Sequence, residues 1–133
     1  MNNEQFLRLL NDKFGFMKKY NAIREKSYRF SHEIIQVCKD LKISREFELS
    51  KQLLKSGTSI GANVEEAIGA PSKRDFINKM SIAYKEARET TYWIRLLKST
   101  DKIPINHALE LLDESQQIER LLVSIIKTSK LNC

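Results

Sequence analysis

Apolar and small side chains recur at alternating steps of four and three residues along most of this 133-residue chain. The clearest run covers three heptads, and its spacing places the members on one face of an α-helix. Such a face is typical of a helix that packs at a shallow angle in a bundle. An isolated coiled coil is not favoured, because other segments also carry apolar faces that must be buried. The run consists of Phe76, Met80, Ala83, Ala87, Thr90, Ile94 and Leu97.

Three other segments show the same periodicity and predict three further helices. The first is expected over about residues 27–41, and the second from an N-cap at Ser44 to about Gly69. The stripe of the first helix consists of Phe30, Ile34, Val37 and Leu41, and Tyr28, Ile35 and Cys38 are expected to widen it. Ser72 and Asn106 are the expected N-caps of the third and fourth helices. Short turns between long helices make neighbours antiparallel. The predicted fold is therefore all-α, an antiparallel up-down-up-down four-helix bundle.

The second predicted helix has an unusual composition. Its apolar face includes Gly57, and Gly61 follows one turn later. Each glycine inside a helix costs about 1 kcal/mol relative to alanine, so we expect a second backbone close to this face. The alternative is a polar contact surface that includes Asn63 and Glu66. The face consists of Ser50, Leu53, Gly57, Ile60, Val64 and Ala67, and that of the fourth helix of Ala108, Leu111, Ser115, Ile118, Leu122 and Ile125.

The first 21 residues are predicted to form an extension of a bundle domain that spans residues 22–133. Phe6, Leu9 and Phe14 fall at helical spacing, which predicts a short accessory helix over about residues 4–14. Gly15 is expected to end it. This helix could dock on the bundle or on a neighbouring subunit.

Charge is unevenly distributed along the chain, whose net charge is +6. Residues 1–30 and 71–100 each carry seven basic and three acidic side chains. Clustered positive charge favours a polyanionic partner, most simply RNA or DNA. The alternative is an ordinary solvated surface.

The sequence predicts a cytoplasmic protein without a membrane segment. Cys38 and Cys133 are too far apart for a disulfide framework, which favours a reducing compartment. Cys38 is expected to be a small core residue. The N-terminus lacks the apolar core of a signal peptide, and no stretch approaches the ~18 apolar residues that span a bilayer.

No motif for catalysis, a metal or a cofactor is found. His32 and His107 are the only histidines, and neither follows a glutamate at the three-residue spacing of di-metal bundles. Two distant cysteines make no zinc site. The chain has no Gly-x-Ser-x-Gly motif, and GTSIGAN lacks the Lys-Ser/Thr ending of a phosphate-binding loop. We therefore expect a protein that is not an enzyme.

Six cations form the candidate nucleic-acid-binding set. Four share one stripe of the third predicted helix, and two are spaced at i, i+4 on the second. Such a row can follow a phosphate backbone and release its counterions. The alternative is a solvated outer face that Glu86 and Glu89 partly neutralise. The six are Lys51, Lys55, Arg74, Lys85, Arg88 and Arg95.

Three glutamates could suggest acid–base chemistry. Glu66 is expected to lie near the start of the third helix, because the second and third helices are antiparallel. Glu86 and Glu89 share a face farther along. We favour ion pairing within the bundle or across a subunit contact, since nothing in the sequence implies the converging pocket that a general acid needs.

Two stretches of the chain resemble a known family. They are QLLKSGTSIGANVEEA, over residues 52–67, and DFINKMSIAYKEARETTYW, over residues 75–93. They resemble the bacterial four-helix bundle proteins encoded within intervening sequences of 23S ribosomal RNA. The resemblance covers about residues 22–131 and leaves the N-terminal extension outside it.

The resemblance implies a cytosolic, non-enzymatic bundle that assembles into a homopentameric, barrel-like ring. A more distant relative is the accessory protein of diversity-generating retroelements, a basic pentamer that binds nucleic acid and a reverse transcriptase. The family has no agreed catalytic residues. Its recurring polar positions, implied here to serve packing or subunit contacts, correspond to Ser59, Asn63, Glu66, Glu86 and Glu89.

Together these features predict an oligomeric protein whose basic helix faces contact the phosphates of RNA or DNA without strong base readout. The alternative is a protein-interaction scaffold that docks a protein partner, such as a reverse transcriptase.

Overall fold

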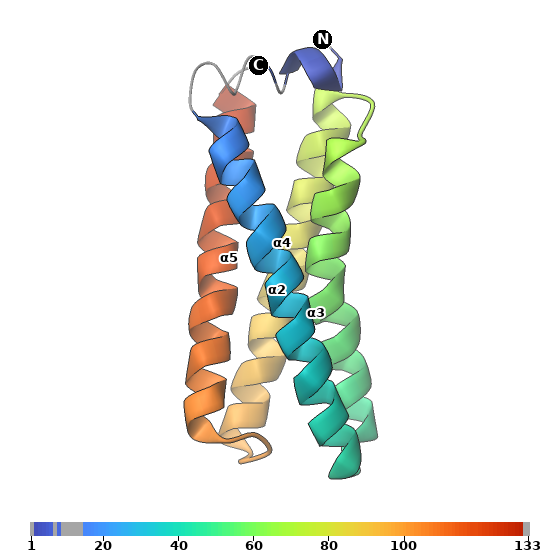
Figure 1. Cartoon of the computed structure of the whole chain (residues 1–133), viewed down its shortest axis with the longest axis vertical. Helices are drawn as coiled ribbons and strands as arrows, with labels where there is room; N and C mark the ends of the chain where they lie inside the picture. The colour runs from blue at the N-terminus through green and yellow to red at the C-terminus, as the bar shows by residue number, and fades with distance from the viewer. Residues whose placement is uncertain (1, 7, 9–14, 132–133) are drawn as a thin grey trace.

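The computed structural model describes residues 2–6, 8 and 15–131, and four long helices packed side by side dominate it (Figure 1). They are α2 (Phe16–Ile43), α3 (Phe47–Ile68), α4 (Lys73–Ser99) and α5 (Ile105–Leu131). Each helix packs against the next in the chain, and α2 also packs against α5, which closes the bundle. The described residues contain one isolated β-bridge and no strand. The predicted all-α four-helix bundle is confirmed.

The two ends of the bundle differ in what they contain (Figure 1). The turns between α2 and α3 and between α4 and α5 lie at the lower end of the view. The turn between α3 and α4 lies at the other end, together with residues 2–6. Because α2 and α4 each pack mainly on α3 and α5, they lie diagonally across the bundle.

The predicted apolar faces form the core. Every member of the faces predicted for α3, α4 and α5 is buried. The face of α2 is only partly as expected. Its stripe at Phe30, Ile34 and Leu41 is buried, whereas Tyr28 and Ile35, expected to widen it, are 66% and 46% exposed.

α2 begins at Phe16, eleven residues before the predicted start of the first bundle helix at Ser27. The reason is that Tyr20, Ile23 and Ser27 are all buried and continue the stripe toward the N-terminus at steps of three and four. α2 therefore runs through the expected boundary at residue 22. Gly15 has a φ of 62°, a left-handed conformation that favours glycine, and α2 begins directly after it.

One predicted helix cap is confirmed. The Asp75 amide donates a hydrogen bond to the Ser72 hydroxyl oxygen over 3.2 Å, which satisfies a free N–H of the first turn of α4. The Ser72 hydroxyl donates in turn to the Asp75 carboxylate over 2.8 Å. The acid therefore supports the cap, although it bonds to the side chain of the cap residue.

Two predicted caps are wrong. Ser44 ends α2, and the N-cap position of α3 is Glu46. The cause is Arg45, whose φ of 65° turns the chain two residues later than expected. α5 begins at Ile105, directly after the loop proline, so Asn106 lies inside the first turn.

The glycines of α3 allow α2 to approach closely. A Cβ atom added at Gly57 would lie 2.7 Å from Cγ2 of Ile34 in α2. At Gly61 it would lie 3.5 Å from the backbone oxygen of Ser27, which is ordinary van der Waals contact. The predicted close backbone is therefore present at Gly61, but only Gly57 requires the absence of a side chain.

Hydrogen bonds fix the register of α2 against α3. The Ser50 hydroxyl donates to the Cys38 carbonyl over 3.0 Å, and the Cys38 thiol donates to the Ser50 carbonyl over 3.3 Å. Near the other end, the Tyr20 hydroxyl donates to the Val64 carbonyl over 2.8 Å. Burial raises the pKa of Tyr20 to about 12. Cys38 is the core residue that was predicted, while Cys133 lies outside the described residues.

A helical turn near the N-terminus packs on the end of the bundle. The Gln5 amide donates to the Asn2 side chain, and the Asn2 amide donates to the Gln5 side chain, which is a reciprocal cap. Phe6 is fully buried, with its ring 5.7 Å from that of Phe76 in an edge-to-face contact. Of the two docking sites considered for this segment, the described residues use the bundle itself. Most of the helix expected over residues 4–14 lies outside the described residues.

We expect Gly57→Ala to destabilise the protein by about 1–3 kcal/mol, because the new methyl group would overlap the stiff β-branched side chain of Ile34. The matched variant Gly61→Ala has room for a methyl group. It should gain up to about 1 kcal/mol from helix propensity. Urea denaturation followed by circular dichroism measures both. Equal effects of the two variants would contradict the close approach at Gly57.

Candidate functional site

The outer face of α4 carries the largest set of exposed cations predicted to act together. Between Lys73 and Ser99 there are seven basic and three acidic side chains, a net charge of +4. Arg74, Lys85 and Arg95 are exposed and make no ion pair among the described residues. They lie on the side of α4 away from the core, over a length of about 32 Å along the helix axis.

Arg88 belongs to the same face but is engaged. Its guanidinium lies 3.7 Å from the Glu119 carboxylate of α5 and donates a hydrogen bond to the Tyr84 hydroxyl over 3.3 Å. These two groups raise the pKa of Arg88. Glu119 is largely buried and also accepts a hydrogen bond from Thr91 over 2.6 Å. Arg88 therefore links α4 to α5, and its guanidinium is already paired with a carboxylate before any ligand binds.

The two lysines of α3 extend the basic face of α4. Lys51 and Lys55 are exposed, and neither forms an ion pair within the described part of the chain. The Glu86 carboxyl lies near both Lys55 and Lys85. Partial burial of Glu86, and then its neighbour Glu89, raise the pKa of that carboxyl, while the two lysines lower it. The structure thus joins the two predicted groups of cations into one surface, with Glu86 between them.

The five polar positions implied by the family resemblance have mainly local partners. The Ser59 hydroxyl donates to the Lys55 carbonyl, and the Asn63 side chain donates to the Ser59 carbonyl, both within α3. Glu66 accepts a hydrogen bond from Lys79 of α4 over 2.9 Å, which confirms its expected place near the start of that helix. Glu89 is exposed beside Glu86. Their part in a subunit contact remains a prediction.

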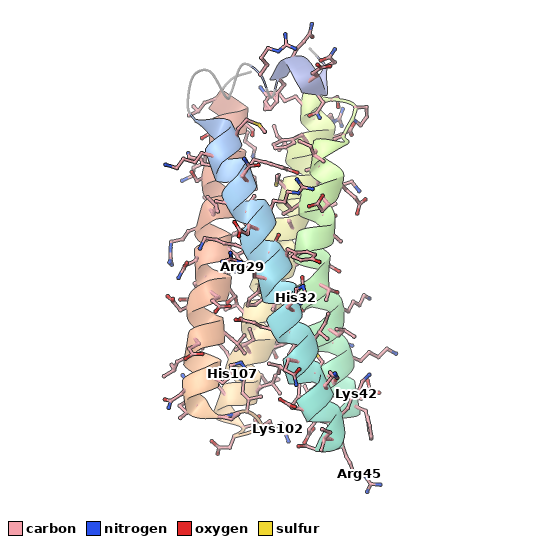
Figure 2. The ribbon with its side chains drawn as sticks, viewed as in Figure 1. Arg29, His32, Lys42, Arg45, Lys102 and His107 are labelled. Carbon is pink, nitrogen blue, oxygen red and sulfur yellow. The ribbon has the colours of Figure 1, made fainter. Side chains whose placement is uncertain are left out.

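α2 is as basic as α4, with seven basic and three acidic side chains, and four of its seven cations have a side-chain partner among the described residues. Arg24 pairs with Glu65 of α3 at 2.5 Å, and Arg29 pairs with Glu25 in its own helix. Lys26 donates a hydrogen bond to a side chain of α5 over 3.1 Å. Figure 2 shows side chains projecting from all four helices, with Arg29 and His32 on α2 among those labelled. Two cations on each of the two helices form ion pairs within the described residues, and α2 has two further lysines that donate hydrogen bonds to neutral side chains of α5.

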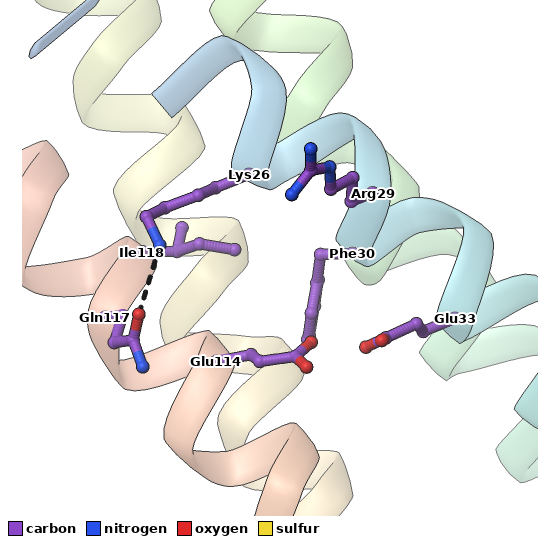
Figure 3. Close-up of a pocket in the computed structure, with 7 residues that line it drawn as sticks. All are labelled: Lys26, Arg29, Phe30, Glu33, Glu114, Gln117 and Ile118. Atoms are coloured by element: carbon purple, nitrogen blue, oxygen red, sulfur yellow. Dashed lines mark hydrogen bonds between the residues drawn. The ribbon is translucent and has the colours of Figure 1, made fainter. Parts of the chain in front are cut away.

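A groove of about 250 Å³ lies between α2 and α5 (Figure 3). These two helices contact each other less than any other adjacent pair in the bundle. Two carboxyl groups, Glu33 of α2 and Glu114 of α5, point toward each other across it. Partial burial raises the pKa of Glu114 to about 8, and a hydrogen bond with Glu33 adds to the shift. The raised pKa favours a protonated Glu114 carboxyl at neutral pH, which can donate a hydrogen bond to Glu33 across the groove.

The sequence analysis did not single out this acid pair. Glu33 precedes the buried Ile34, and Glu114 precedes the buried Ser115, so both flank the core stripe of their helix. Flanking acids on two helices that meet are a signal for such a pair. The signal becomes specific only when the inter-helix register is known.

The described residues show no arrangement suited to a metal. This part of the chain has no group of three or more His, Cys, Asp and Glu side chains that could hold a metal ion. His32 lies on the exposed side of α2, with its ring 4.9 Å from that of Tyr28, whereas His107 lies on α5. No described helix combines the length and apolar character needed to cross a membrane.

Comparison with known proteins gives two findings. The sequence model of the family described as 23S rRNA-intervening sequence protein matches residues 19–124. The structure is similar to the crystal structure of a protein of unknown function from the S23 ribosomal protein family of Bacteroides thetaiotaomicron VPI-5482. The two chains are 46% identical, with a TM-score of 0.79, and the match covers 82% of this chain and 98% of the other. Comparison with the curated proteins gives no match.

The raised pKa of Glu114 predicts a pH dependence of stability. Below its ordinary pKa of 4.5, Glu114 is protonated in both the folded and the unfolded chain, so the free energy of unfolding does not change with pH because of this group. Between pH 4.5 and 8 the unfolded chain has released the proton and the folded chain has not, so the free energy of unfolding falls as the pH rises. The Glu114→Gln variant keeps a hydrogen-bonding group and should lose this fall. Its stability relative to wild type should therefore increase from pH 5 to pH 9.

Urea denaturation of wild type and variant at pH 5, 7 and 9 measures this difference. The matched control is Glu48→Gln, an exposed carboxylate of α3 that is not among the groups that shift the pKa of Glu114. A stability difference between Glu114→Gln and wild type that does not change with pH would show that the carboxyl ionises normally.

Proposed function

The chain belongs to the 23S rRNA-intervening sequence protein family, and from this premise we propose that it is a non-enzymatic, homopentameric four-helix bundle that binds nucleic acid in the cytoplasm. RNA is the first candidate ligand, and DNA the second. The surface formed by the outer face of α4 and the two lysines of α3, named here the α4 surface, makes the contact. It binds phosphates and does not read the sequence through base edges.

The observation that carries this proposal is that most cations of the α4 surface form no ion pair among the described residues. Cations that are already paired gain little when they meet a phosphate, because they exchange one anion for another. Five of the six predicted cations make no ion pair within the described residues. They are Lys51, Lys55, Arg74, Lys85 and Arg95.

We expect the triple variant Arg74→Gln, Lys85→Gln, Arg95→Gln to bind a fluorescein-labelled structured RNA more weakly than wild type. The slope of log affinity against log salt concentration should fall by about two to three, since each lost phosphate contact removes about 0.7–0.9. Fluorescence anisotropy between 50 and 200 mM salt provides the measurement.

The matched control is the triple variant Arg24→Gln, Lys26→Gln, Arg29→Gln, which removes the same charge from the engaged cations of α2. It should leave the slope nearly unchanged. Wild-type protein that does not bind at 50 mM salt, or whose binding is indifferent to salt, would rule out the proposal. An equal loss in both variants would rule out the α4 surface.

The homopentamer is tested by mass in solution. Multi-angle light scattering should give five times the chain mass of 15.5 kDa at micromolar concentration. The family resemblance motivates this expectation, and the ring decides whether the α4 surfaces of several chains act together. A concentration-independent mass of one chain would refute it.

A second candidate function is a scaffold that docks a protein partner. The observation that favours it is a group of exposed apolar side chains on the two turns at one end of the bundle. Ile43 is 81% exposed, Phe47 59% and Ile105 54%. Capture of one protein from the native host that survives ribonuclease treatment, and that is lost in the double variant Ile43→Ser, Phe47→Ser, would support this candidate over RNA binding.

A further inference from the structure

An exposed aromatic side chain lies among the cations in the C-terminal third of α4. Tyr92 is 54% exposed. It follows Arg88 by four residues and precedes Arg95 by three, so the three side chains share one side of the helix. The Tyr92 ring meets that of Trp93 edge to face, with the centroids 5.1 Å apart. Because Trp93 packs partly buried against the core, this contact holds the tyrosine ring in place.

A shallow hollow of about 300 Å³ adjoins this ring near the end of α4. Two cations, Arg95 and Lys98, line it together with Leu96 and Ser99. Neither cation forms an ion pair among the described residues. No carboxylate lines the hollow. It therefore offers a flat aromatic ring and two available positive charges side by side.

We propose that this hollow binds an unpaired base of a single-stranded nucleic acid, with the base stacked on Tyr92 and the adjoining phosphates bound by Arg95 and Lys98. The inference rests on the proposed function and specifies the class of nucleic acid. Every base has a flat face that can stack on an aromatic ring, so such a site tolerates any sequence. In a duplex the bases are already stacked and paired, and they cannot reach the ring without being unpaired.

The other exposed tyrosine provides a comparison. Tyr28 of α2 is 66% exposed and lies beside a hollow lined by Arg24, Glu25 and Glu65. Glu65 already pairs with Arg24. Carboxylates at this site repel phosphate, and its arginine is occupied. Tyr28 therefore has similar exposure without the free positive charge, which makes it a matched control.

The test uses the full chain and two fluorescein-labelled probes, an unstructured 20-nucleotide oligouridine and a blunt-ended 20-base-pair RNA duplex without a loop. Tyr92→Ala should lower the affinity for oligouridine by about tenfold, as expected for loss of one stacked base, and leave duplex binding unchanged. Tyr92→Phe keeps the ring and should bind oligouridine like wild type. Tyr28→Ala should bind both probes like wild type. Circular dichroism checks that each variant is folded.

Three results would overturn the inference. Tyr92→Ala could bind oligouridine like wild type, it could lose affinity for both probes equally, or Tyr28→Ala could lose as much as Tyr92→Ala. In each case salt-dependent binding of the duplex by wild-type protein would leave the proposed function intact. Wild-type protein that binds neither probe at 50 mM salt would remove the proposed function, and the inference with it.

Discussion

Close burial of one stripe of side chains from each of four antiparallel helices is the constraint on which the rest of the structure depends. The stripes of α3 and α4 combine large residues with small ones, such as Gly57 and Ala87, so the helices approach closely and leave no room for charged groups in the core. The buried hydroxyls are hydrogen-bonded, as in the pair Ser56 and Thr90 at 2.9 Å. The charged side chains of the described residues are thereby kept out of the fully buried core, and function has to be sought on the helix surfaces.

The charges outside the core are sorted by helix. α2 and α4 each have a net charge of +4, whereas α3 and α5 each have −1, so basic and slightly acidic helices alternate around the bundle. Neighbouring helices consequently form ion pairs, which run from α2 to α3, from α4 to α3 and from α4 to α5. These exposed pairs add little stability. They determine which cations of the described residues remain without an ion pair, and on α4 most of those cations lie on its outer side.

The heptad pattern was sufficient to predict the core of α3, α4 and α5, because burial imposes a period that the sequence must display. The start of α2 and the caps at Ser44 and Asn106 were mispredicted, since a cap depends on local backbone geometry such as the left-handed turn at Arg45. Helical spacing was sufficient to predict that the six candidate cations are exposed. The engagement of Arg88 by Glu119, and of Glu33 with Glu114, could not, because each pair forms between helices whose register only the folded structure defines.

The α4 surface also has consequences for how strongly one chain can bind. Five unpaired cations spread over two helices contact few phosphates, so a single chain should bind a polyanion weakly and without sequence preference. A ring would repeat the same surface on each subunit. A long nucleic acid bound at one α4 surface is then held at high effective concentration near the next, which can raise the overall affinity by about 10²–10⁴ without any new kind of contact. In the proposed ring, the state of assembly and the length of the bound strand would therefore be physically linked.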